Sequence, residues 1–139
     1  MALIVHKYGG TSMGSTERIR NVAKRVAKWA RAGHQMVVVP SAMSGETNRL
    51  LALAKELAPL RTTEAYGREL DMLAATGEQA SSALLAIALQ AEGLESVSYA
   101  GWQVPIRTDS AYTKARIESI DDARAVSYTH LTLPTILRV

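Results

Sequence analysis

Cysteine is absent from this sequence of 139 residues. Its absence excludes disulfide bonds, thiolate nucleophiles and cysteine-based zinc sites, and it is compatible with a reducing cytoplasm. No apolar run approaches the roughly 18 residues of a membrane span. The first residues also lack the basic-then-apolar layout of a secretion signal. We therefore expect a cytoplasmic globular protein that has no membrane partner.

The sequence also has no preformed catalytic or metal-binding set. The three histidines, His6, His34 and His130, lie far apart, without the spacing of metal ligands. Acidic residues do not cluster as a preformed metal site, and no Ser/His/Asp set presents itself. We expect no metal site built from protein side chains, so the chemistry must be sought in loops.

The composition is that of a folded protein. Hydrophobic residues make up 47% of the chain and charged residues 21%, which excludes a disordered class. The length suits one domain or part of a larger one. The net charge of +3 suits an anionic ligand but is weak evidence by itself.

A glycine pair follows the first apolar run of the chain. Residues 2–5 (ALIV) are long enough for a buried strand, and residues 6–12 (HKYGGTS) come next. The glycines let backbone N–H groups approach a ligand closely, Lys7 adds a mobile positive charge, and hydroxyls follow. This combination indicates a phosphate cradle. It matches neither GxxxxGK[ST] nor GxGxxG, so a plain glycine-rich turn after an edge strand is an equal alternative on the residues alone.

The next segments predict a right-handed βαβ unit. Ser15 or Thr16 caps a helix with an apolar stripe at i, i+3, i+4 spacing, and Gly33 ends it. Residues 36–39 (MVVV) form a β-branched run typical of a buried parallel strand. Because ligands bind beyond the carboxyl ends of such strands, the glycine segment and residues 40–48 (PSAMSGETN) should lie at one edge of the sheet.

The middle of the chain predicts three helices. Thr47 and Asn48 are candidate N-caps of the first helix, which runs to about Ala58 before Pro59. A second helix contains Tyr66, Leu70 and Leu73, and Gly77 breaks the chain after it. Residues 78–89 (EQASSALLAIAL) form a third helix that is apolar almost all round and so buried on most sides.

Glu78 has two interpretations at the start of that third helix. It either complements the helix dipole or holds a cationic group such as an ammonium, and the residues alone favour the dipole. Further on, residues 97–100 predict a strand, residues 101–102 a turn, residues 104–108 an extended segment and residues 115–117 the start of another strand.

Basic residues cover the outer face of the first helix, so a nucleic-acid interface is an alternative there. No aromatic residues are interleaved with them for base stacking. We therefore interpret this surface as a solvated helix face and expect no nucleic-acid partner.

Several motifs together resemble the aspartate kinases, a branch of the amino-acid kinase superfamily. They are HKYGGTS at residues 6–12, PSAMSGETNRL at residues 40–50, ATGEQASSALLA at residues 75–86, GWQVPIRTDS at residues 101–110 and KARIESID at residues 114–121. The resemblance implies a three-layer αβα sandwich with a mainly parallel α/β sheet. It also implies transfer of the γ-phosphoryl group of ATP to the side-chain carboxylate of L-aspartate, giving 4-phospho-L-aspartate. This reaction begins the biosynthesis of lysine, threonine, methionine and diaminopimelate.

The resemblance also implies roles for individual residues. Lys7, Tyr8, Gly9 and Gly10 match the ATP-phosphate segment of the family, and Lys7 is the implied catalytic residue because it would neutralise charge on the transferring group. The substrate-facing matches are Ser41, Thr47 and Glu78. Here the resemblance favours a contact of Glu78 with the α-ammonium of aspartate over a dipole role. No general base is needed because the attacking carboxylate is already ionised, and the nucleotide phosphates would mainly hold Mg²⁺.

The resemblance covers roughly residues 2–124, and we take residues 1–125 as the N-terminal part of a kinase domain. Residues 126–139 do not continue the family pattern and resemble translated sequencing-adapter sequence, so we expect this tail to be foreign; the alternative is a divergent strand and tail. We expect the remaining half of the kinase domain and the regulatory domains to lie outside this chain. The isolated chain should therefore be inactive, whereas the parent enzyme should be a homo-oligomer.

Two other functions are open from the sequence. One is another acyl-phosphate-forming amino-acid kinase, for example one acting on glutamate. The other is a non-catalytic module that binds aspartate without turnover.

Overall fold

The computed structural model describes residues 1–58, 63–104, 106–120 and 135–137. Its helices and strands, in chain order, are β1 (Leu3–Tyr8), α1 (Thr16–Arg31), β2 (Gln35–Pro40), α2 (Glu46–Leu57), α3 (Glu64–Ala91), β3 (Val97–Tyr99), β4 (Ile106–Thr108), β5 (Ile117–Ile120) and β6 (Thr135–Leu137). The β1-α1-β2 order and the parallel main sheet confirm the α/β class. The strands predicted after the helices are confirmed as β3, β4 and β5.

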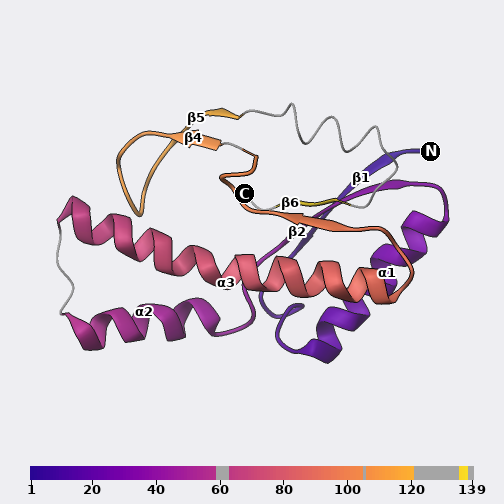
Figure 1. Ribbon diagram of the computed structural model, residues 1–139, viewed down its shortest axis with the longest axis horizontal. Helices are drawn as coiled ribbons and strands as arrows, with labels where there is room; N and C mark the ends of the chain where they lie inside the picture. Colours follow the sequence, from indigo (N-terminus) through magenta and orange to yellow (C-terminus); the bar gives the residue numbers. More distant parts are fainter. Residues whose placement is uncertain (59–62, 105, 121–134, 138–139) are drawn as a thin grey trace.

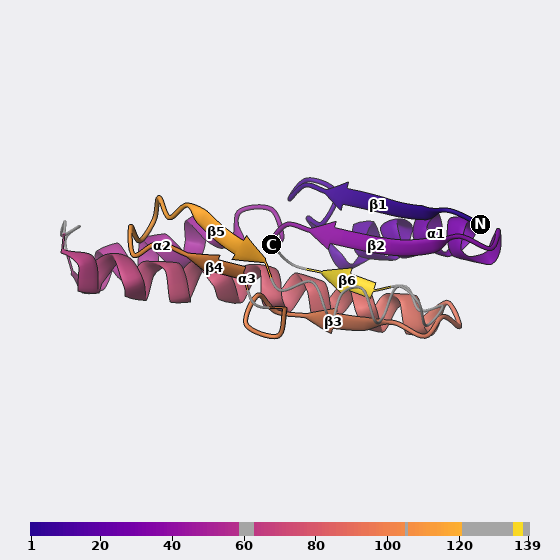
Figure 2. The ribbon, with the colours of Figure 1, turned by 90° about the horizontal axis from the view of Figure 1, so that it is seen from above.

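The main sheet has the strand order β1-β2-β6-β3, and all its pairings are parallel. The pairing of β1 with β2 runs in register from Leu3–Gln35 to Tyr8–Pro40. Together with α1, this confirms the predicted βαβ unit. The other two strands, β4 and β5, form a separate antiparallel hairpin (Figure 2).

All three helices lie on the same side of the main sheet (Figure 1). The longest, α3, packs against α1, α2 and the sheet. The core between the sheet and the helices consists of Met13, Ile19, Val22, Ala23, Val26, Met36, Val38, Leu85, Ala86 and Leu89. The described residues thus form two layers, a mainly parallel sheet and helices on one side of it; they do not include the second helical layer of the predicted αβα sandwich.

The first strand differs from its prediction as a buried strand. Leu3 is 53% exposed and Val5 62% exposed, whereas Ile4 and Tyr8 pack against the core. Within the described part of the chain, β1 pairs with β2 only, so it is an edge strand with one uncovered face.

The helix termini follow the predicted capping residues in part. Ser15 caps α1 and accepts a hydrogen bond from the amide of Arg18, as predicted. Gly33 follows the C-cap residue of α1, Ala32, and has φ +85°, a conformation that favours glycine. The assignment of Thr47 and Asn48 as N-caps is wrong: α2 begins at Glu46 and its N-cap is Gly45, so both residues lie in the first turn.

The predicted break at Gly77 is also wrong, because α3 continues from Glu64 to Ala91. Gly77 is buried inside this helix, where the loop after β2 and the start of α2 come close to its Cα. Packing thus outweighs the weak helix propensity of glycine. Glu78 consequently lies in mid-helix, so its interpretation as a partner of the helix N-terminus is wrong.

Because α3 is continuous, it forms one long apolar helix. By length and composition alone, this helix is long and apolar enough to cross a membrane. It packs against α1, α2 and the sheet, and the core helix of a globular protein meets the same criterion. It is also less buried than predicted, because Leu84 and Ile87 are exposed.

The tail predicted as foreign, residues 126–139, falls largely outside the described residues. So does Pro59, the predicted stop after α2. Of the tail, the structure describes β6, which lies between β2 and β3 and pairs with both.

Candidate functional site

Two loops meet at the carboxyl ends of β1 and β2, as the βαβ order predicts. The amide of Ser41 donates to the carbonyl of Tyr8 at 2.8 Å, which ties the second loop to the end of β1. A Cβ on Gly10 would lie 3.3 Å from the carbonyl oxygen of Ala42. Glycine at this position therefore lets the two loop backbones pack directly against each other.

The glycine segment closes on itself as a turn. The amides of Ser12 and Met13 donate to the carbonyls of Gly9 and Gly10, both at 3.0 Å. The amides of Gly10 and Thr11 form no hydrogen bond within the described part of the chain. Unpaired amides in a glycine turn at the end of a parallel strand are suited to an anionic ligand.

A pocket of about 390 Å³ lies between the two loops and α3. It is lined by Gly10, Thr11, Ser41, Ala42, Met43, Ser44, Gly45, Thr47, Asn48 and Glu78. The structure thus brings together all three predicted substrate residues and one of the predicted phosphate-binding glycines. The pocket contains hydroxyl and amide groups and a single carboxylate, a set suited to a small polar ligand that carries an ammonium group.

Close packing at Gly77 puts Glu78 in this pocket. A Cβ on Gly77 would lie 3.2 Å from Cβ of Ala42, 3.4 Å from Cγ of Glu46 and 3.6 Å from Cδ1 of Leu50. A side chain at this position would require Ala42 or the neighbouring helix to shift by a few tenths of an ångström. Because Glu78 follows directly in the helix, the small size of Gly77 keeps its carboxylate near the loop.

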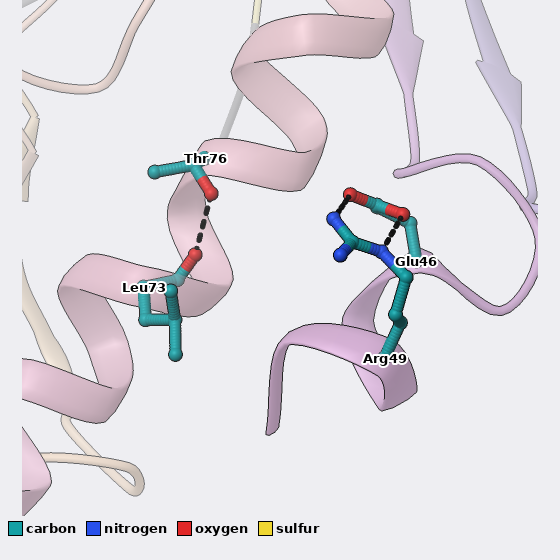
Figure 3. Close-up of polar contacts among 4 residues, drawn as sticks. All are labelled: Glu46, Arg49, Leu73 and Thr76. Atoms are coloured by element: carbon teal, nitrogen blue, oxygen red, sulfur yellow. Dashed lines mark hydrogen bonds and ion pairs between the residues drawn. The ribbon is translucent and has the colours of Figure 1, made fainter. Parts of the chain in front are cut away.

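A second carboxylate near the pocket, Glu46, forms an ion pair. Glu46, at the start of α2, accepts two hydrogen bonds from Arg49, at 2.7 and 2.9 Å (Figure 3). These bonds from Arg49, together with its positive charge, lower the pKa of the Glu46 carboxyl below its ordinary value of 4.5. Glu46, in α2, lies close to Gly77 of α3, and the ion pair with Arg49 balances its negative charge there.

Lys7 lies over the glycine turn but does not line the pocket. Its Nζ is 3.8 Å from the place where a Cβ of Gly9 would be. Together with Tyr8, Lys24, Arg25 and other residues, it lines a separate hollow beside α1. The structure therefore brings the predicted catalytic lysine to the glycines and separates it from Ser41, Thr47 and Glu78.

The side chain of Tyr8 faces α1, away from the pocket. Its hydroxyl lies 3.2 Å from Nδ1 of His6. Partial burial raises the pKa of Tyr8 above 10, against the opposing positive charge of Arg25. It is the backbone carbonyl of Tyr8, bonded to the amide of Ser41, that contributes to the loop contact.

Sequence reasoning missed several residues of the site. Thr11, Ser44 and Asn48 line the pocket but were not predicted to contact the substrate. The number of hydroxyl and amide side chains in residues 40–48 was the available signal for the last two. The sequence gives no sign that Ser81, four residues after Gly77, hydrogen-bonds to the loop.

The described residues include no group of three His, Cys, Asp or Glu side chains that could hold a metal ion. Glu78 is the one carboxylate that lines the pocket. This donor set does not fit Mg²⁺ bound by protein carboxylates, whereas a metal held by ligand phosphates needs no such set.

Comparisons with known proteins agree with this geometry. The family model described as the amino acid kinase family matches residues 2–130. The aspartate kinase of Pseudomonas fluorescens is 57% identical over 124 residues, which cover 89% of this chain and 30% of the relative.

Two solved structures resemble this chain in fold. The aspartate kinase of Synechocystis superposes with a TM-score of 0.83 at 36% identity, over 97% of this chain and 21% of that one. An isopentenyl phosphate kinase shares the fold with a TM-score of 0.72 at 17% identity, over 99% of this chain and 57% of that one. The chain spans about 30% of the length of the curated relatives it matches. Because the family model covers most of its residues, the chain belongs to the amino acid kinase family.

Proposed function

We propose that the protein to which this chain belongs is an aspartate kinase. It would transfer the γ-phosphoryl group of ATP to the side-chain carboxylate of L-aspartate and release 4-phospho-L-aspartate. The observation that carries the proposal is the pocket that joins the glycine turn, the loop after β2 and Glu78. Relatives named aspartate kinase, up to 57% identical over this segment, support the choice of substrate.

Different residues of the pocket suit the ammonium group and the carboxylate groups of aspartate. We assign Glu78 to the α-ammonium group, because it is the one carboxylate of the pocket. Ser41 and Thr47, on the opposite wall, would donate hydrogen bonds to a substrate carboxylate. The side-chain carboxylate of aspartate is ionised at neutral pH, so it attacks without a general base.

The glycine turn and Lys7 suit the phosphates of ATP. The amides of Gly10 and Thr11, which have no hydrogen-bond partner among the described residues, would donate to phosphate oxygens. The close approach of Gly10 to the neighbouring loop suits a backbone contact. Lys7 Nζ, above Gly9, would neutralise negative charge on the transferring phosphoryl group. Mg²⁺ would be held mainly by the nucleotide phosphates, since the described residues provide no carboxylate set for it.

The wider assignments follow from the same proposal. We assign the protein to the cytoplasm, where ATP and free aspartate are available, and to amino-acid biosynthesis. We propose a homo-oligomer for the whole protein. We also propose that residues 1–125 belong to the kinase domain and that residues 126–139 do not, although the family model extends to residue 130 and β6 pairs with β2 and β3.

A fusion tests the function directly. Residues 1–125 of this chain are joined to the remaining part of the Pseudomonas fluorescens aspartate kinase, and acyl phosphate is trapped as a hydroxamate. We expect product with L-aspartate and at least a hundredfold lower kcat/KM with L-glutamate. Equal use of glutamate would indicate another amino-acid kinase. No turnover by the fusion, combined with calorimetric binding of aspartate to the 139-residue chain, would indicate a binding module.

A further inference from the structure

Ser41 is held by its backbone on two sides. Its amide donates to the carbonyl of Tyr8 at 2.8 Å, and its own carbonyl accepts a hydrogen bond from Oγ of Ser81, also at 2.8 Å. The first bond reaches the end of β1, and the second reaches the middle of α3. Ser41 therefore connects the glycine turn to the helix that carries Glu78.

The bond from Ser81 is a specific tertiary contact. Ser81 is fully buried, and its hydroxyl lies 2.8 Å from the carbonyl oxygen of Ser41 but 3.1 Å from that of Glu78, within its own helix. A buried serine in a helix usually bonds to its own preceding turn. Here the shorter bond goes to a residue forty positions away in the sequence.

Ser81 is one turn from Gly77, and both contact the same loop. Gly77 admits Ala42 to within van der Waals contact, while Ser81 fixes the carbonyl of the preceding residue, Ser41. Glu78 lies between them in the sequence and lines the pocket that Ser41 and Thr47 also line. The two contacts therefore set the distance between the two walls of the pocket.

We propose that Ser81 is a positioning residue for substrate binding. It does not line the pocket; it acts through Ser41, holding the loop after β2 at the right distance from Glu78. This inference rests on the proposed function, since it assigns the pocket to aspartate. The hydrogen bond from Ser81 fixes the carbonyl of Ser41, while the close contact at Gly77 fixes the next residue, Ala42.

Ser82 provides a matched control. It is 2% exposed and adjacent in the same helix, but its hydroxyl has no hydrogen-bond partner among the described residues. Ser81→Ala and Ser82→Ala therefore each delete one buried hydroxyl from the same turn of α3. Only Ser81→Ala breaks a link to the pocket.

The kinetic test uses the fusion described above. We expect Ser81→Ala to raise KM for L-aspartate at least tenfold, with KM for ATP within twofold of the parent value. Ser82→Ala should change neither constant, and Ser81→Thr, which keeps the hydroxyl, should restore most of the affinity for aspartate. Equal effects of Ser81→Ala and Ser82→Ala, or an equal rise of both KM values in Ser81→Ala, would overturn the inference.

Hydrogen exchange on the 139-residue chain separates this inference from the proposed function. We expect Ser81→Ala to speed exchange of the Ser41 amide at least tenfold relative to Ser82→Ala, while amides in α1 keep their protection. Unchanged protection at Ser41 would refute the positioning role even if the fusion is an aspartate kinase. An inactive fusion whose Ser81→Ala chain still loses this protection would refute the proposed function and support the link between Ser81 and the loop.

Discussion

Gly77→Ala tests the tight contact between α3 and the loop after β2. In an exposed helix interior, replacing glycine by alanine stabilises by about 1 kcal/mol, because alanine loses less backbone entropy on folding. At Gly77 the new methyl group would lie 3.2 Å from Cβ of Ala42 and 3.4 Å from Cγ of Glu46. Ala42 is buried, so it has little room to move.

Forcing a methyl group into a packed interface costs about 1–3 kcal/mol. Set against the gain in propensity, Gly77→Ala should lower the free energy of unfolding by about 0–2 kcal/mol. This range includes no change, so the variant needs a reference in the same helix. Gly67 supplies one, because a Cβ there would also lie 3.2 Å from a neighbouring Cβ, that of Tyr112, but Tyr112 and Thr113 are exposed residues of the segment between β4 and β5.

Gly67→Ala should raise the free energy of unfolding by about 0.5–1 kcal/mol, because its neighbours can move outwards. The gain in propensity is common to both variants and cancels in their difference. We therefore expect Gly77→Ala to be less stable than Gly67→Ala by about 1–3 kcal/mol in urea denaturation. Equal stability of the two variants would refute the close packing at Gly77 and, with it, the explanation for where Glu78 lies.

Three further predictions concern the charged groups and the glycine turn. In the fusion, Lys7→Ala should lower kcat about a hundredfold or more and change KM for aspartate by less than about threefold. This pattern is expected when a residue stabilises charge in the transition state. A change in KM alone would contradict the catalytic assignment of Lys7. Glu46→Gln should destabilise the chain at pH 7. The lowered pKa of Glu46 stabilises the folded state above about pH 4.5, and this stabilisation is lost as the carboxylate is protonated. The difference in free energy of unfolding between the variant and the parent should therefore shrink as the pH falls below about 4.5. Urea denaturation from pH 3 to pH 7 measures this difference, and a constant value would argue against the ion pair with Arg49. Gly10→Val should displace the loop after β2, because the valine side chain would clash with the carbonyl of Ala42. In the fusion it should raise KM for both aspartate and ATP. If neither KM rises, the two loops do not need to touch.

Local sequence patterns predicted the first half of the site well. The βαβ order, the cap at Ser15 and the position of Gly33 all follow from residue type and spacing over short distances. The meeting of two loops at the carboxyl ends of β1 and β2 then follows from the topology of a parallel sheet.

The other half depends on contacts between residues far apart in the chain. Gly77 predicts a helix break by propensity, but its lack of a side chain serves packing against Ala42, which the sequence does not reveal. The role of Ser81 depends on Ser41, forty residues away, and nothing in the surrounding residues indicates the pairing. Glu78 entered the site only through resemblance to the aspartate kinases, since the spacing of residues favoured a different role.

The most direct test of the site is the effect of Glu78→Gln on KM for L-aspartate in the fusion. A hydrogen bond between charged groups contributes about 1.5–3 kcal/mol, which corresponds to roughly a 10- to 100-fold change in affinity. We expect KM for aspartate to rise within this range, with KM for ATP within twofold of the parent value. An unchanged KM for aspartate in an active Glu78→Gln fusion would contradict the claim that this pocket holds the substrate.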